Sequence, residues 1–143
     1  MNWRSSPAEK IELFRALFRG RDDVYARFWS DERTGRKGYS PATTDRSKGR
    51  GCAKRYLPLT GDVLYRHLAG KHIVGLFPLL PGDTCFFLAC DFDGATWAPD
   101  ALGFLEAADR WRVPAYLERS RSGPGGHVWI FFTRPVTAVP ARR

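Results

Sequence analysis

The stretch TCFFLACDFDG, residues 84–94, decides the fold. An apolar run of this length, which follows the turn Pro81-Gly82-Asp83, predicts a buried strand from Thr84 to Phe92. Asp91 and Asp93 stand two residues apart at its end, so they share one face of the sheet. Two such carboxylates repel each other unless a cation lies between them, and oxygen ligands of this kind suit Mg²⁺ or Mn²⁺. The pattern therefore predicts a metal site at Asp91 and Asp93. The alternative is a pair of turn-forming acids after a strand.

A second informative stretch is ERSRSGPGGHVW, residues 118–129. It predicts a strand over 115–119, a glycine-rich loop over 120–126 and a strand over 127–132. Glycines let backbone N–H groups approach phosphate oxygens, and arginine and serine side chains add further donors. The phosphate-binding candidates are therefore Arg119, Arg121, Ser122, Gly125, Gly126 and His127. The alternative is a flexible hairpin turn with incidental arginines. Glu118 is expected to pair with one of these arginines, without a catalytic role.

The rest of the chain supplies helices and further strands. Ser6, Pro7 and Glu9 predict the capped start of a helix that runs to Gly20. Further elements are expected at 24–29 (strand), 60–70 (helix), 72–77 (strand) and 99–112 (helix), and the strand 72–77 is expected to form a hairpin with 84–92. From residue 60 the order is α, β, β, α, β, β. This order is typical of an α+β fold in which a split β-α-β sheet carries its helices on one face.

The domain organisation follows from the same elements. We expect one domain over 1–143, with an N-terminal helical and basic region at 1–59 and a sheet core at 60–143. Only eleven residues follow Phe132, so the sheet is expected to be truncated at its C-terminal side.

The charge distribution points to a polyanionic partner. The net charge is +8 over 143 residues, and residues 1–60 hold most of the surplus, with 14 basic against 7 acidic side chains. Between Arg33 and Arg55 there are eight basic residues and one acid, Asp45, which predicts an exposed loop. Its candidate nucleic-acid contacts are Arg36, Lys37, Lys48, Arg50, Lys54 and Arg55. The alternative is a solvated surface loop.

The apolar runs and the cysteines indicate in which cell compartment the chain is expected. The longest apolar runs, 73–80 and 85–90, are too short to span a membrane. Charged residues interrupt the first 20 positions, so no signal peptide is expected and the chain is expected in the cytoplasm. Cys52, Cys85 and Cys90 are an odd set without CxxC spacing, which favours reduced thiols over disulfides or zinc.

The two informative stretches together resemble a known family. A strand that ends in Asp-x-Asp, then a helix, a strand and a Ser-Gly-x-Gly-Gly-His turn into a further strand, resembles the archaeo-eukaryotic primase superfamily. The sequence is most similar to the primase-polymerase domains of TOTE-type conflict systems. Four further stretches also fit: 11–25 (IELFRALFRGRDDVY), 38–42, 56–60 (YLPLT) and 75–83 (GLFPLLPGD).

The resemblance implies both a fold and a site. The implied sheet is RRM-like. Asp91 and Asp93 would be metal ligands of the family's first motif, and His127 would be the second-motif histidine that contacts the phosphates of the incoming nucleotide. Ser122 and the glycines around it would assist.

The resemblance also implies an activity. The chain would be a nucleotidyltransferase of the DNA or RNA primase-polymerase type, acting on nucleoside triphosphates and on single-stranded or primed DNA or RNA, with helicase or nuclease modules in the same protein. The family also uses a third acidic residue on a later strand. No Asp or Glu follows His127 here, so that carboxylate is expected beyond Arg143. Relatives often carry a cysteine-rich, zinc-binding insert, of which only Cys52 is present, so zinc is not expected.

Two other classes remain as alternatives. A non-catalytic nucleic-acid-binding module would keep the sheet and the basic loop. The stretch DFDGAT, residues 91–96, is superficially similar to the nucleophile motif of haloacid-dehalogenase-like phosphatases. That chemistry also needs a downstream Lys, which residues 94–143 do not contain.

Overall fold

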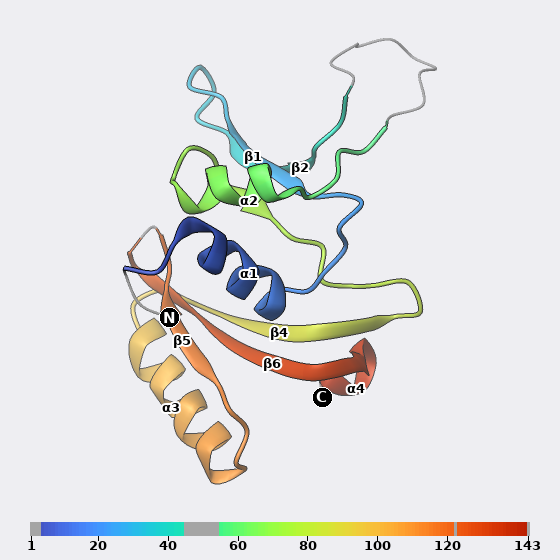
Figure 1. Cartoon of the computed structure of the whole chain (residues 1–143). Coiled ribbons are helices and arrows are strands. Elements are labelled where there is room, and N and C mark those ends of the chain that lie inside the picture. Colours follow the sequence, from blue (N-terminus) through green and yellow to red (C-terminus); the bar gives the residue numbers. More distant parts are fainter. Residues whose placement is uncertain (1–3, 45–54, 122, 143) are drawn as a thin grey trace. The chain divides into compact units, whose positions relative to one another are not determined.

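The structure is a computed structural model that describes residues 4–44, 55–121 and 123–142. It comprises two compact units, Met1–Pro81 and Gly82–Arg143, which are described separately below (Figure 1). The expectation of a single domain over 1–143 stays a prediction. Within the described residues, no helix has the length and apolar character needed to cross a membrane.

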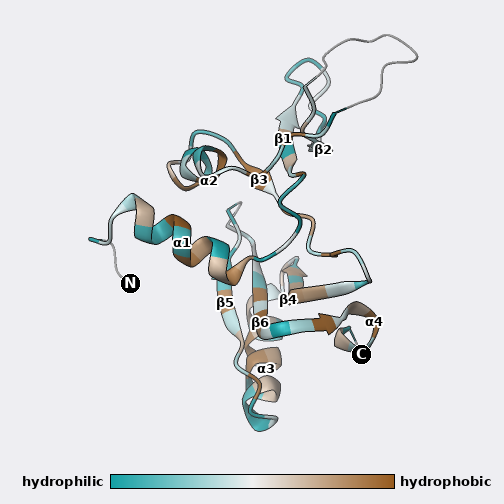
Figure 2. Cartoon of the chain, turned by 45° about the vertical axis from the view of Figure 1, so that its right-hand side comes forward, coloured by the Kyte–Doolittle hydropathy of each residue, from teal (hydrophilic) through white to brown (hydrophobic). Residues whose placement is uncertain are grey.

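The first unit begins with the helix α1 (Pro7–Leu17), whose start is fixed by local chemistry. The Ser6 hydroxyl accepts from the Glu9 backbone N–H at 3.3 Å, and the Ser6 backbone N–H donates to the Glu9 carboxylate at 2.7 Å. This reciprocal pair satisfies two donors that a helix start leaves open. Apolar and polar residues alternate along α1 (Figure 2). The predicted N-terminal helix is confirmed and ends three residues before Gly20.

The second helix, α2 (Gly61–Leu68), begins after Thr60, whose side chain caps it by accepting from the Val63 backbone N–H at 3.3 Å. Leu64 is its buried residue. The sequence placed this helix correctly, because a threonine cap and a closing glycine are local signals.

The sheet of the first unit differs from expectation. It joins β1 (Ala26–Ser30), β2 (Lys37–Pro41) and β3 (Val74–Gly75) in the antiparallel order β2-β1-β3. The prediction of one exposed loop from Arg33 to Arg55 is therefore wrong at 37–41, where β2 pairs along its whole length with β1. Residues 45–54 of that loop lie outside the described residues.

The predicted hairpin between 72–77 and 84–92 is also wrong. The strand β3 has only two residues, and it pairs with β1. Gly75 permits this pairing, because a Cβ there would lie 3.2 Å from that of Ala26 and 3.3 Å from the Tyr39 ring. Beyond β3, the Phe77 carbonyl accepts from the Arg21 backbone N–H at 2.9 Å. Residues 74–77 therefore form hydrogen bonds with other residues of the first unit.

The second unit contains β4 (Thr84–Asp93), α3 (Trp97–Arg110), β5 (Tyr116–Arg119), β6 (Gly125–Thr137) and the short α4 (Ala138–Ala141). The strand order is β4-β6-β5. Because β6 is antiparallel to both neighbours, β4 and β5 are parallel and β6 lies between them. This arrangement, with α3 as the crossover, is the predicted split β-α-β unit. The α+β prediction is confirmed.

The helix α3 covers one face of this sheet. The rings of Phe92 and Phe104 meet edge to face at 5.8 Å, and a Cβ on Gly126 would lie 2.9 Å from the Trp97 ring. Val128 and Ala101 are fully buried. The opposite face therefore presents Asp91, the residue that alternates with Phe92 on β4.

The pairing of β4 with β6 is regular from Asp93 to Phe87 and then shifts between Phe87 and Cys85. Cys85 is buried, and both Cys85 and Cys90 are free thiols. Burial raises the pKa of the Cys90 thiol. Cys52 lies outside the described residues.

Candidate active site

The register of β4 against β6 builds the centre of the site. Asp91 stands directly opposite His127, and Asp93 stands opposite Gly125. Residues opposite each other in a ladder share a face, so both aspartates and the histidine lie on the face away from α3. The His127 Nε2 atom is 3.5 Å from Oδ1 of Asp91. The Asp91 side chain is 68% exposed and that of His127 is 35% exposed, so a ligand from solvent can reach them.

Gly125 allows the second aspartate to pack closely against β6. A Cβ at this position would lie 2.8 Å from Oδ1 of Asp93 and 3.1 Å from both the Phe92 carbonyl and the Ser120 hydroxyl. Any side chain would therefore push the carboxylate aside. Exposed carboxylates on one face of a sheet fit a hard divalent cation. Among the described residues, no three His, Cys, Asp or Glu side chains lie together in a way that could hold a metal ion. Asp91 and Asp93 therefore lack a third ligand of these types in this part of the chain.

Glu118 belongs to the site, although the sequence predicts it only as the partner of a nearby arginine. In the β5–β6 ladder it stands opposite His127, and its Oε2 atom is 3.6 Å from Nδ1 of the imidazole. The indole Nε1 of Trp129 donates to the same oxygen at 2.8 Å. The sequence contains only part of the signal for this. Two strands joined by a short loop pair as a hairpin, but a hairpin closed over loop 120–126 would pair Arg119 with His127. The structure pairs Arg119 with Gly126 instead, and this shift of one residue brings Glu118 opposite His127.

Backbone hydrogen bonds shape the glycine-rich loop. The Ser120 N–H donates to the Gly125 carbonyl at 2.9 Å, and the Gly123 N–H donates to the Ser120 carbonyl at 3.0 Å. The guanidinium Nε of Arg119 donates to the Gly123 carbonyl at 3.1 Å. Gly123 has φ of 94°, a conformation that favours glycine.

The structure separates some of the predicted phosphate-binding residues. Arg119 stands opposite Gly126, so it belongs to the α3 face rather than to the face of Asp91. Gly126 opens toward Trp97 on that same face. Arg121 is exposed, and Ser122 lies outside the described residues.

An aromatic row continues the face of His127 along the sheet. The His127 and Trp129 rings meet edge to face at 5.8 Å, and the Trp129 and Phe131 rings are nearly parallel at 6.4 Å. Phe87 on β4 contacts both Trp129 and Phe131, and Tyr116 on β5 contacts Phe131. The row packs around Trp129 and so restrains the indole that binds Glu118.

The predicted nucleic-acid contacts lie in the first unit. Arg36 and Lys37 are exposed at the start of β2. Arg55 is also exposed, and its carbonyl accepts from the Thr44 backbone N–H at 3.0 Å. Lys48, Arg50 and Lys54 lie outside the described residues.

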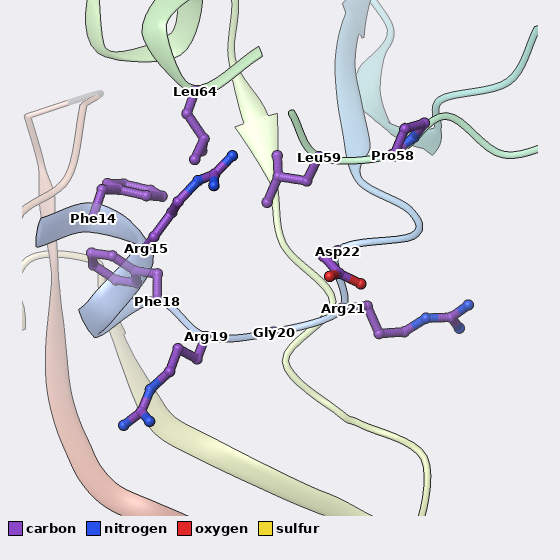
Figure 3. Close-up of a pocket in the computed structure, with 10 residues that line it drawn as sticks. All are labelled: Phe14, Arg15, Phe18, Arg19, Gly20, Arg21, Asp22, Pro58, Leu59 and Leu64. Carbon is purple, nitrogen blue, oxygen red and sulfur yellow. The ribbon is translucent and has the colours of Figure 1, made fainter. Parts of the chain in front are cut away.

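The first unit also contains a pocket of about 400 Å³ between α1 and the start of α2. Arg15 extends between Leu59 and Leu64, whereas Arg19 and Arg21 extend away from that gap (Figure 3). Arg21 is paired with Asp23 at 2.6 Å. None of the site residues predicted from the sequence lines this pocket.

The chain matches a known family over most of its length. A family model described as the archaeo-eukaryotic primase domain of the TOTE conflict system matches residues 9–143. No curated protein matches the chain.

Proposed function

The chain belongs to the archaeo-eukaryotic primase domain family of TOTE conflict systems, and on that premise we propose that it is a metal-dependent nucleotidyltransferase that synthesises or extends nucleic-acid primers. The observation that carries the proposal is the ladder that sets Asp91 opposite His127 and Asp93 opposite Gly125, on the face away from α3. A carboxylate pair and a histidine on one exposed face of the sheet suit the handling of a nucleoside triphosphate.

The proposed roles follow from position. Asp91 and Asp93 would hold Mg²⁺ or Mn²⁺, and the absence of a side chain at Gly125 lets the Asp93 carboxylate keep its position against β6. When bound, such ions neutralise phosphate charge and stabilise the attacking and leaving oxygens of the transfer. His127 presents Nε2 on the Asp91 side, where it contacts the phosphates. Backbone N–H groups of the loop, with Ser122 and Arg121, complete the phosphate contacts.

Arg119 has a different role in this proposal. Its Nε atom donates to the Gly123 carbonyl, and its ladder position puts it on the α3 face. It therefore maintains the shape of the glycine-rich loop rather than contacting phosphate. The basic residues of the first unit supply sequence-independent affinity for a nucleic-acid strand.

The test combines calorimetry with primer extension. Titration of a nucleoside triphosphate with Mg²⁺ or Mn²⁺ is expected to show binding that Asp91→Asn and Asp93→Asn each weaken at least tenfold. In any form of the protein that extends a primer, Asp91→Asn and Asp93→Asn are each expected to abolish that extension. Asp109→Asn is the matched control, because Asp109 is an exposed acid in the last turn of α3.

Metal-dependent nucleotide binding that survives both aspartate variants would contradict the proposal. Binding of single strands without any nucleotide binding would instead favour the alternative of a non-catalytic nucleic-acid-binding module.

A further inference from the structure

Glu118 and His127 face each other across β5 and β6. The Glu118 side chain is 57% exposed, and its Oε2 atom lies 3.6 Å from Nδ1 of His127. This distance is beyond a hydrogen bond and within reach of an ion pair. Nδ1 is buried and has no hydrogen-bond partner among the described residues. A buried ring nitrogen normally has a partner, and the Glu118 carboxylate is the acceptor beside it.

The carboxylate is itself held in place. The Trp129 indole donates to Oε2 at 2.8 Å, and Trp129 is restrained by ring contacts with Phe87, His127 and Phe131. Charge-assisted hydrogen bonds of this length are among the stronger ones in proteins. Glu118 therefore has a defined position despite its exposure.

The two ring nitrogens of His127 lie beside different carboxylates. Nε2 lies 3.5 Å from Asp91, and Nδ1 lies 3.6 Å from Glu118. Rotation of the ring by half a turn about the Cβ–Cγ bond would put Cδ2 in place of Nδ1 and Cε1 in place of Nε2. The fixed carboxylate on the β5 side favours the orientation with Nδ1 beside it, and this orientation keeps Nε2, rather than a ring carbon, on the Asp91 side.

We propose that Glu118 is a positioning residue for His127: held by Trp129, it keeps Nδ1 on the β5 side and so presents Nε2 to the nucleotide phosphates. The contact with phosphate rests on the function proposed above, whereas the orientation of the ring does not. Second partners of functional histidines act in this way in other sites, where they fix the ring and its tautomer.

A double-mutant cycle tests the proposal. Glu118→Ala is expected to weaken nucleoside triphosphate binding about tenfold, and Trp129→Phe to weaken it less. Glu118→Gln keeps an oxygen that can accept from both partners, so its affinity should stay within about twofold of the wild type. In a His127→Ala background, Glu118→Ala should have no further effect, because Glu118 acts through the ring. An equal loss with and without His127 would overturn the proposal.

A spectroscopic readout separates this proposal from the proposed function. Without nucleotide, the imidazole ¹⁵N resonances of His127 should shift in Glu118→Ala and Trp129→Phe and remain in place in Glu106→Ala, a change at an exposed acid on α3. Resonances that do not move in the Glu118 variant would overturn the positioning role. If the resonances shift but His127→Ala leaves nucleotide affinity unchanged, the proposed function is refuted and the orientation of His127 by Glu118 is supported. Melting temperatures of all variants identify those that fold.

Discussion

Gly125 lies directly opposite Asp93 in the β4–β6 ladder, and a Cβ on Gly125 would lie 2.8 Å from Oδ1 of that carboxylate. The position of the Asp93 carboxylate depends on the absence of a side chain at Gly125, because real Cβ atoms do not approach other atoms so closely. Gly125→Ala is therefore expected to displace the Asp93 carboxylate and to weaken metal-dependent nucleotide binding about tenfold. Calorimetric titration of a nucleoside triphosphate at fixed Mg²⁺ or Mn²⁺ measures the effect.

Gly103→Ala is the matched control for that prediction. Gly103 lies within α3, and a Cβ there would meet no atom within 4 Å. Alanine in a helix interior is favoured over glycine by about 0.5–1 kcal/mol, so this variant should be more stable and bind nucleotide normally. Equal affinities of the two variants would show that Gly125 has no special place in the site.

The neighbouring Gly126 faces the other side of the sheet, so its substitution should act differently. A Cβ on Gly126 would lie 2.9 Å from the Trp97 ring and 3.1 Å from the Leu117 side chain. Gly126→Ala is expected to overpack the contact between α3 and the sheet and to lower the free energy of unfolding by about 1–3 kcal/mol. Urea unfolding followed by tryptophan fluorescence measures this. Unchanged stability would mean that α3 can move away from β6 at no cost.

The capping pair of α1 predicts a dependence on pH. Hydrogen bonds from the backbone and the side chain of Ser6 lower the pKa of Glu9 below its ordinary value of 4.5. A carboxyl group whose pKa is lower in the folded state contributes stability above its unfolded pKa, and that contribution is lost as the pH falls through the folded pKa. The wild type should therefore melt above Glu9→Gln at neutral pH, and the difference should shrink below about pH 4.5.

A second acid on the same helix provides the comparison. Glu12→Gln removes an exposed carboxylate of α1 that is not part of the capping pair. Its melting temperature should follow the wild type across this pH range. If the difference between the wild type and Glu9→Gln is the same at pH 3 and pH 7, the capping pair does not stabilise α1 through the charge of Glu9.

Salt dependence tests the basic residues of the first unit. Combined alanine substitution of Lys48, Arg50, Lys54 and Arg55 is expected to weaken binding of a labelled single strand. It should also reduce the slope of log affinity against log salt, by up to about 0.7 for each phosphate that the variant no longer neutralises. A control with the same change in net charge replaces the exposed Lys71, Arg110, Arg134 and Arg142. Equal slopes for the two fourfold variants would mean that only total charge matters.

Local signals explain why parts of this structure could be predicted. The Ser6–Glu9 pair and the Thr60 cap act over three residues, and the alternation that sets Asp91 and Asp93 on one face needs only one strand. The split order β4-β6-β5 followed from the sequence of elements, since a parallel pair needs a crossover.

Pairings between distant segments were harder to predict. The strand β3 lies close in sequence to β4, yet its two residues pair with β1, far upstream in the chain. Such pairing depends on which backbone N–H and C=O groups still lack a hydrogen-bond partner after the rest of the sheet has formed. Glu118 was missed for a related reason. Its role depends on a cross-strand neighbour nine positions away, whereas an ion pair with an adjacent arginine was the more local interpretation.

The irregular pairing near Cys85 has a consequence for how this chain can vary in length. From Asp93 to Phe87, β4 and β6 advance residue for residue, but between Phe87 and Cys85 two steps along β4 correspond to five along β6. A residue inserted after Phe131 can be accommodated in this irregular part of the ladder. A residue inserted between Gly125 and Trp129 moves every later side chain to the opposite face and turns His127 or its neighbours toward α3. We therefore expect evolution to tolerate insertions and deletions at one end of β6 and to reject them at the other.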